Sequence, residues 1–143
     1  MRRLFQTAII IFFALTLSSL ADSSARVQDP GKFCDDLFAD ISPFRSAEIA
    51  EKVAAAIGKP EAAEALTNGL KLLEGRKIDF SRKVIDKDFS NALRQIVYYA
   101  YVENIGFVYF RVNFKMTSTG WILANFNFKS ETIELFPKDF VEP

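Results

Sequence analysis

The chain has 143 residues, of which half are apolar, and it carries 18 basic and 18 acidic side chains. It has no histidine and a single cysteine, Cys34, which excludes histidine-based triads, histidine metal sites, cysteine-rich zinc sites and an internal disulfide. The balanced charge lacks the basic footprint that nucleic-acid binding requires. We therefore expect no metal, no cofactor and no nucleic-acid partner.

Residues 1–25 have the order of a secretory signal peptide. Two arginines are followed by an apolar run over 4–17 and then by small residues, which is the pattern of a cleavable leader. Cleavage after Ala21 and cleavage after Ala25 both fit the small-x-small rule. An uncleaved anchor is the alternative, but the apolar run is shorter than the ~20 residues that cross a bilayer. We predict export to the periplasm or beyond, no membrane anchor after cleavage, and one domain over 26–143.

Amphipathic helices are expected in the first half of the mature chain. The first begins at Asp29-Pro30 and ends before Ser42-Pro43, because proline cannot continue the helical hydrogen bonds. Ser46 is a favourable N-cap for the second helix, and Gly58 ends it. The side chains expected to face the core from these two helices are Phe33, Leu37, Phe38, Ile41, Ile49, Val53, Ala56 and Ile57.

A third helix is expected from Pro60 to Gly75, with a bend or break at Asn68-Gly69. From Lys77 the pattern changes to alternating residues that are rich in aromatic and β-branched side chains. The expected strands run over about 78–88, 91–103, 107–117 and 121–131. Three helices packed on a curved four-stranded antiparallel sheet make an α+β fold.

The registers of the two later hairpins can be predicted, because residues directly opposite each other share a face of the sheet. A four-residue loop over 117–120 would place Phe114 opposite Leu123 and Val112 opposite Asn125, which mixes the faces. A three-residue loop over 118–120 instead gives the apolar pairs Phe114–Ala124, Val112–Phe126 and Phe110–Phe128. The same loop form over 104–106 gives the pairs Val102–Val108, Ala100–Phe110, Tyr98–Val112 and Ile96–Phe114.

The last hairpin, with Tyr-Phe-Arg-Val-Asn-Phe-Lys over 109–115 and Gly-Trp-Ile-Leu-Ala-Asn-Phe over 120–126, resembles the final hairpin of NTF2-like proteins of the cystatin-like superfamily. In that family a Gly-Trp pair often opens a late strand, and the order of elements over 33–131 is also similar. The resemblance implies a cone-like sheet and dimerisation through its outer face. The family includes isomerases, dehydratases, ligand binders and envelope domains, so the resemblance does not fix a function.

Arg94 and Tyr98 lie on the sheet face that is expected to be buried. They predict a pocket in which Tyr98 donates a hydrogen bond and Arg94 meets an anionic group of a ligand. The alternative is a core tyrosine beside an arginine that extends to solvent. Asp36 and Asp40, four residues apart on the first helix, are interpreted as part of a solvated face, and we expect Cys34 to be buried.

The opposite sheet face is unusually apolar for a solvated surface. Its predicted interface residues are Tyr99, Tyr101, Tyr109, Arg111 and Trp121, which are of the types that protein interfaces concentrate. The expected register places Tyr101 opposite Tyr109 and Tyr99 opposite Arg111. Two covers remain open: a second copy in a homodimer, or the C-terminal residues, whose apolar members are Ile133, Leu135, Phe136 and Phe140.

The chain lacks a specific catalytic motif, so we predict an exported, non-catalytic accessory module. It binds a small apolar or anionic ligand, or a protein partner. The alternative is a small NTF2-like lyase or isomerase that uses Tyr98 and a buried carboxylate with a raised pKa. A third hypothesis is an inhibitor or adaptor that presents loops such as 103–106 to an exported enzyme.

Overall fold

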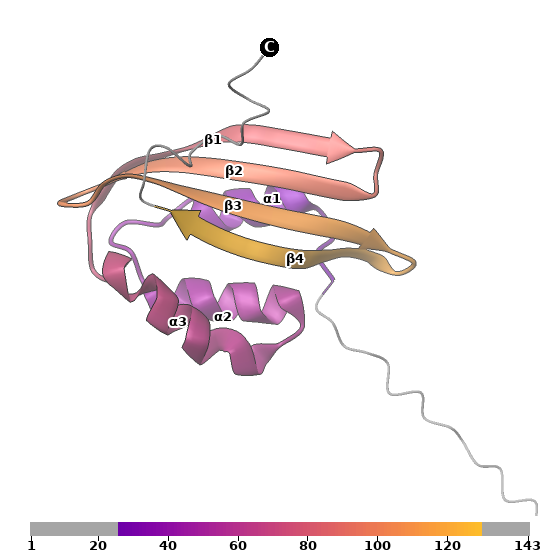
Figure 1. Ribbon diagram of the computed structural model, residues 1–143, viewed down its shortest axis with the longest axis horizontal. Helices are drawn as coiled ribbons and strands as arrows, with labels where there is room; N and C mark the ends of the chain where they lie inside the picture. Colours follow the sequence, from indigo (N-terminus) through magenta and orange to yellow (C-terminus); the bar gives the residue numbers. More distant parts are fainter. Residues whose placement is uncertain (1–25, 130–143) are drawn as a thin grey trace, which may run out of the picture.

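The computed structural model describes residues 26–129 (Figure 1). Three helices precede four strands, and the sheet is antiparallel with the order β1-β2-β3-β4, which confirms the expected α+β class. The predicted signal peptide and the C-terminal residues 130–143 lie outside the described part. The elements are α1 (Pro30–Phe38), α2 (Ser46–Ile57), η1 (Pro60–Ala62), α3 (Ala63–Leu70), η2 (Lys71–Leu73), β1 (Ile78–Phe89), β2 (Leu93–Val102), β3 (Gly106–Thr117) and β4 (Gly120–Lys129).

Helix α1 begins where the sequence predicts. The Asp29 carboxylate accepts hydrogen bonds from the backbone N–H groups of Gly31, at 2.7 Å, and Lys32, at 3.3 Å, so it caps the first turn. The helix ends at Phe38, and the chain then continues without helix through Ile41, which remains buried as expected.

The start of α2 differs from the expectation. Ser46 is the first helical residue rather than the N-cap, and the N-cap position is held by Arg45 without a side-chain hydrogen bond. The Ser46 backbone N–H donates to Glu74 Oε2 at 2.6 Å, and the Ser46 hydroxyl donates to the carbonyl of Leu70 at 3.1 Å. The cap is therefore supplied from the end of the third helical segment, and it ties that segment to α2. The left-handed Gly58 ends α2 as predicted.

The third helical segment is divided into three short parts. A 3-10 turn at Pro60–Ala62 leads into α3, and a second 3-10 turn follows at Lys71–Leu73. The change of geometry therefore comes directly after Asn68-Gly69, where the sequence predicts a weak point. The N–H of Gly75 (φ 69°) donates to the carbonyl of Phe44 at 2.8 Å rather than to its own helix.

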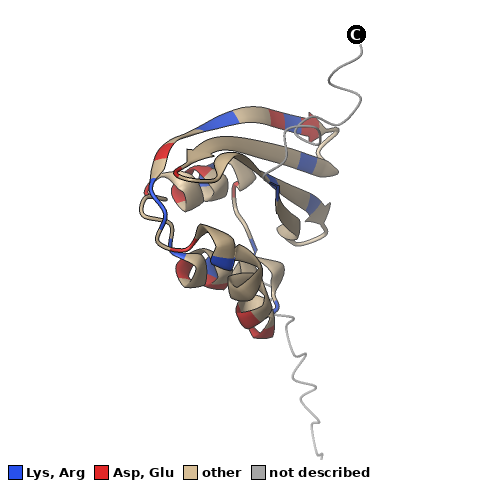
Figure 2. Ribbon diagram, turned by 60° about the vertical axis from the view of Figure 1, so that its left-hand side comes forward, with Lys and Arg blue, Asp and Glu red and all other residues tan. Residues whose placement is uncertain are grey.

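All three helices lie on one side of the sheet (Figure 1), which we call the inner face. The sheet curls over α1, with α2 and α3 below it (Figure 2). The ring of Phe38 lies 4.3 Å from that of Tyr98, and the ring of Phe44 stacks on Phe110 at 6.0 Å. Side chains therefore fill the space under the centre of the sheet. The inner-face residues of β2 and β3 that are buried are Ile96, Tyr98, Ala100, Val102, Val108, Phe110, Val112 and Phe114.

The predicted register between β2 and β3 is wrong by two residues. The observed loop is Glu103–Ile105, so Val102 lies opposite Gly106 and Tyr98 opposite Phe110. Asn104 takes the left-handed conformation (φ 63°) and allows this earlier turn. A shift of two residues keeps every side chain on its face, so the burial pattern cannot distinguish the two registers. The outer pairs change accordingly to Tyr99–Tyr109 and Tyr101–Phe107.

The register between β3 and β4 changes at a bulge, where Ala124 is the extra residue. Val112–Phe126 and Phe110–Phe128 pair as predicted, but Phe114 lies opposite Leu123 instead of Ala124. The turn is shorter than expected, with Thr117 directly opposite Gly120. One consequence is that Trp121 and Leu123 pack against the core under the inner face, whereas the sequence places them on the opposite face.

Candidate ligand-binding cleft

The two residues predicted to bind a ligand, Arg94 and Tyr98, form hydrogen bonds with other side chains of the protein. Tyr98 is buried under Phe38, and its hydroxyl donates a hydrogen bond to the Asp35 carboxylate. Arg94 Nε and Nη2 donate to the two oxygens of Asp86 at 2.8 and 3.0 Å. Tyr98 and Arg94 share the inner face as expected, but neither lines the cleft described below.

A polar network joins these pairs and fastens α1 to the sheet. Lys83 Nζ lies 3.0 Å from Asp35 and 3.7 Å from Asp86, so it links the Tyr98–Asp35 pair to the Asp86–Arg94 pair. The Arg94 guanidinium also packs against α1, because a Cβ added to Gly31 would lie 2.9 Å from its Nη2. The network thereby connects α1 to both β1 and β2.

The electrostatics of this network favour ionised carboxylates. The hydrogen bond from Tyr98, followed by that from Lys83, lowers the pKa of Asp35, and the hydrogen bond from Arg94 lowers the pKa of Asp86. Burial raises the pKa of the Tyr98 hydroxyl. The lyase or isomerase alternative needs a buried carboxyl group with a raised pKa. Asp35, the carboxyl that meets Tyr98, instead has a side chain that is 57% exposed and a lowered pKa.

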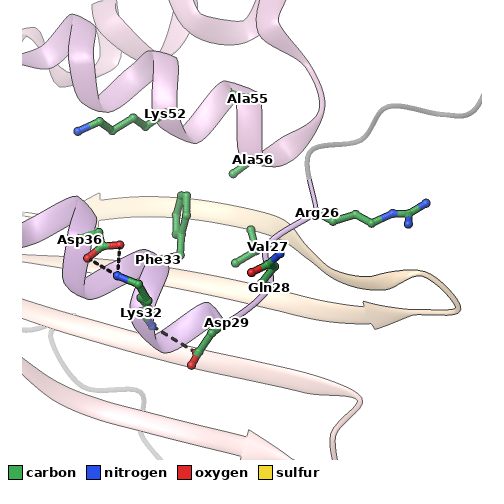
Figure 3. A pocket seen from close by; sticks show the side chains of 10 residues that line it. All are labelled: Arg26, Val27, Gln28, Asp29, Lys32, Phe33, Asp36, Lys52, Ala55 and Ala56. Atoms are coloured by element: carbon green, nitrogen blue, oxygen red, sulfur yellow. Dashed lines mark hydrogen bonds and ion pairs between the residues drawn. The ribbon is translucent and has the colours of Figure 1, made fainter.

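A cleft of about 450 Å³ lies between α1, with the residues directly before it, and the C-terminal half of α2 (Figure 3). We call it the α1–α2 cleft. Its apolar wall is formed by Val27, Phe33, Ala55 and Ala56. The remaining lining residues are Arg26, Gln28, Asp29, Lys32, Asp36 and Lys52.

Local packing explains why the space stays open. The two adjacent alanines near the end of α2 leave room above Phe33, whose ring points from α1 toward α2 (Figure 3). That ring is fixed by an edge-on contact with Phe114, at 6.0 Å between centroids. Val27 is fixed by a β-bridge in which its N–H donates to the carbonyl of Trp121 at 2.9 Å. The apolar wall is thus continuous with the core.

Positive charge lies at both ends of the cleft. The side chain of Arg26 extends from one end and that of Lys52 from the other (Figure 3). Lys52 is paired with Glu48 at 2.8 Å, and Lys32 is paired with Asp36 at 2.8 Å. Arg26 forms no ion pair with any other residue of the range 26–129, so it is available to an anionic group.

No family model, curated protein or solved structure matches the chain. The functional assignment therefore depends on the geometry of the cleft and of the surfaces around it.

A second apolar groove, of about 390 Å³, lies between α3 and β4. Its apolar lining is formed by Ala62, Ala65, Leu66, Gly69, Leu70, Phe126 and Phe128. None of its lining residues is charged, so this groove offers nothing to fix the orientation of a polar ligand.

The remaining candidate residues have structural explanations. Cys34 is fully buried as predicted, and burial raises the pKa of its thiol to about 12. Asp36 is an exposed partner of Lys32. No group of three or more potential metal ligands occurs within 26–129. In the same range, no helix has both the length and the apolar character that crossing a bilayer requires.

The predicted interface residues separate into two groups. Tyr99, Tyr101, Tyr109 and Arg111 lie on the sheet face that points away from the helices, which we call the outer face. Trp121 does not, because the bulge at Ala124 turns it toward the core.

The sequence predicts that Phe33 and Ala56 face the core, and both do, but it does not reveal the cleft beside them. The signal that could have found it is the run of small residues in Ala54-Ala55-Ala56. This run leaves space wherever a neighbouring helix presents a large ring to it.

Proposed function

We propose that this protein is an exported, non-catalytic module that binds a small amphipathic ligand in the α1–α2 cleft. The ligand class is an alkyl chain with an anionic head. The observation that carries the proposal is an apolar wall bounded at both ends by cationic side chains, with Arg26 unpaired within the described range. Support for export comes from the leader pattern of residues 1–25.

The dimensions of the cleft agree with this class of ligand. Ligand sites generally enclose roughly 300–1,000 Å³ and combine an apolar lining with a few polar groups that fix orientation, and the cleft encloses about 450 Å³. Burying about six methylene groups contributes roughly 5 kcal/mol, which the cost of association largely offsets. One charge-assisted contact adds about 2 kcal/mol, so a weak affinity on the order of 1–10 mM is expected.

The carboxylates and lysines that line the cleft are engaged with other residues of the protein. The lining residues of the cleft include no Ser, Thr, Cys, Tyr or His. Its two carboxylates have structural partners, since Asp29 caps α1 and Asp36 pairs with Lys32. Binding without chemistry is the function that these residue types support best.

We also propose that the α+β fold of this protein is NTF2-like. Three helices followed by a curling four-stranded antiparallel meander support an NTF2-like architecture. In this protein the space under the centre of the sheet holds Phe38 and Phe110, so the binding site lies at the edge of the helical layer.

Trp121 is the sole tryptophan of the chain and contacts Val27 in the wall of the cleft, so its fluorescence can report occupancy. We expect decanoate, titrated below its micellar concentration, to change this fluorescence saturably. Decyltrimethylammonium should bind more weakly, because the end charges are positive. Ala55→Phe places a ring in the cleft and should weaken decanoate binding by about tenfold or more, which is the loss of at least ~1.4 kcal/mol.

The matched control is Ala47→Phe, which adds the same ring to an exposed position in the first turn of α2, outside the cleft. It should leave decanoate binding unchanged. Equal binding by both variants, or equal binding of the anionic and cationic amphiphiles, would overturn the proposal.

A further inference from the structure

The outer face of the sheet combines an apolar centre with an excess of positive charge. Val97 and Tyr109 form a small cluster there, against which Ile85 and Tyr99 pack. The basic residues at outward register positions are Arg82, Lys87, Arg111, Lys115 and Lys129. Strands β2, β3 and β4 contain no acidic residue, and the acidic side chains of residues 26–129 lie on the helices, the loops and β1 (Figure 2).

Two details indicate that this face is not a free surface. Val97 and Tyr109 are only 4% and 5% exposed, although the helices lie on the other side of the sheet. The Nε atom of Arg111 is buried and has no hydrogen-bond partner within the described residues. A buried guanidinium nitrogen without an acceptor is costly, so the centre of the face requires an apolar cover that also brings a hydrogen-bond acceptor.

The 14 residues that follow β4 have the complementary composition. The segment 130–143 carries one lysine against four acidic residues, and five large apolar residues lie between them. The acidic residues are Glu131, Glu134, Asp139 and Glu142. The apolar residues are Ile133, Leu135, Phe136, Phe140 and Val141.

The position where β4 ends makes this cover easy to reach. Lys129 is paired with Tyr109 in the sheet register, and Tyr109 is paired with Tyr99 on the next strand. Adjacent strands are separated by about 4.8 Å, so the four-stranded sheet is roughly 15 Å wide. Fourteen residues reach roughly 45 Å when extended. The chain can therefore return across the whole face, with the loop closed at little entropic cost.

We propose that residues 130–143 bind across the outer face of their own sheet. Apolar side chains of the segment cover Val97 and Tyr109, and a carboxylate of the segment accepts from Arg111. A segment bound there occupies the surface through which a homodimer would form, so the protein is a monomer while it is covered. The outer face lies on the opposite side of the sheet from the helices that form the α1–α2 cleft, so this inference does not depend on the ligand proposal.

The test uses the full mature chain with a nitroxide attached at Lys138→Cys. Cys34 does not compete for the label, because it is buried and its thiol pKa is raised to about 12, and the unsubstituted chain serves as the control for this. Paramagnetic broadening is then read at methyl groups in ¹³C spectra. We expect Val97 and Ile85, on the outer face, to lose most of their intensity, while Ala47 on α2 keeps its own.

A charge-reversal variant tests the specific contact. Arg111→Glu should restore the intensity of the Val97 and Ile85 methyls, because it repels the acidic segment. Lys59→Glu, which makes the same charge change at an exposed position before η1, should leave the broadening unchanged. Unaltered shifts of inner-face methyls such as those of Val112 show that both variants are folded.

Three results would overturn the proposal. The first is the absence of broadening at Val97 and Ile85. The second is broadening centred on Leu66, which would place the segment in the α3–β4 groove instead. The third concerns a mixture of two proteins, one enriched in ¹³C without a nitroxide and the other carrying the nitroxide without enrichment. Broadening of the Val97 and Ile85 methyls in this mixture would identify a second copy as the cover.

Discussion

At the residue scale, the ionisable side chains that most resemble a catalytic group connect α1 to the sheet. Tyr98, Asp35 and Lys83 form a chain of hydrogen bonds between α1 and the sheet, and Arg94 with Asp86 extends it. A carboxylate beside a tyrosine hydroxyl is also what a proton-transferring enzyme would use. The hydrogen bond from Tyr98 lowers the pKa of Asp35, which is the direction expected for a carboxylate held in a structural network.

The Tyr98–Asp35 contact should be visible in stability. Tyr98→Phe keeps the ring packed on Phe38 but removes the hydroxyl donor, so we expect a loss of about 1 kcal/mol at neutral pH. The folded-state pKa of Asp35 is lowered, so this contribution is complete above the unfolded-state pKa, about 3.9. It is lost as the pH falls through the lower folded-state value.

Denaturant unfolding at pH 7 and at pH 3 measures the difference directly. The difference in free energy of unfolding between the wild-type protein and Tyr98→Phe should become smaller at the lower pH. Tyr101→Phe on the outer face, whose hydroxyl has no part in this network, should show a gap that is independent of pH. A constant gap for Tyr98→Phe would mean that the hydroxyl does not stabilise the carboxylate.

The cap of α2 gives a second residue-scale prediction. Glu74→Gln removes the negative charge of the carboxylate that accepts from the Ser46 N–H. Hydrogen bonding with Ser46, first through its side chain and then through its backbone, lowers the pKa of Glu74. We expect a loss of about 1 kcal/mol, in the range of other helix caps, measured by thermal unfolding. Glu51→Gln, an exposed change within α2, should cost less. Equal losses would show that the Glu74 contact does not cap the helix.

At the scale of elements, the sequence predicts the helices and strands well from the spacing of apolar residues, but it predicts the pairing of residues between strands poorly. Alternation predicts the four strands and which side chains of β2 and β3 face the core, since burial imposes a period of two. It cannot distinguish registers that differ by two residues. For this reason the sequence predicts Arg111 as the partner of Tyr99, whereas the observed partner is Tyr109. The cap from Glu74 was also hidden, because it joins residues that are 28 positions apart.

The bulge in β4 explains why the sequence predicts the wrong face of the sheet for Trp121 and Leu123. On either side of Ala124 the strand alternates regularly, but the two halves are out of phase by one residue. A single continuous alternation therefore assigns Phe126 and Phe128 correctly and reverses Trp121 and Leu123. Local sequence does not mark Ala124 as the extra residue. The register does, because Asn113 pairs with Asn125 and Phe114 pairs with Leu123.

Deleting Ala124 tests this explanation. The shortened strand would alternate without a bulge and would still direct Trp121, Leu123, Phe126 and Phe128 inward. We therefore expect its free energy of unfolding to remain within about 1 kcal/mol of the wild type. Deleting Asn127 should cost about 2 kcal/mol or more, because it forces one of the two phenylalanines outward. If the Ala124 deletion is the more damaging of the two in urea unfolding, the bulge has a role that the facing pattern does not explain.

At the scale of the whole molecule, the two sides of the sheet have different surfaces. The inner face, α1 and α2 form a filled core with a cleft at its edge, while the outer face is apolar, basic and suited to the acidic C-terminal segment. The α+β class follows from the sequence because it depends on periodicity. The cleft does not, because its volume depends on how closely α1 packs against α2. Small side chains such as Ala55 leave this space open, and no periodic pattern in the sequence reports it.

The most direct test of the ligand proposal is to locate an anionic amphiphile on the protein. Intermolecular nuclear Overhauser effects between ¹³C-labelled decanoate and the mature protein report which side chains touch the alkyl chain. We expect contacts to the methyls of Ala55, Ala56 and Val27 and to the ring of Phe33. Contacts confined to Leu66 and Phe128 in the α3–β4 groove, or no contacts at millimolar decanoate, would contradict binding in the α1–α2 cleft.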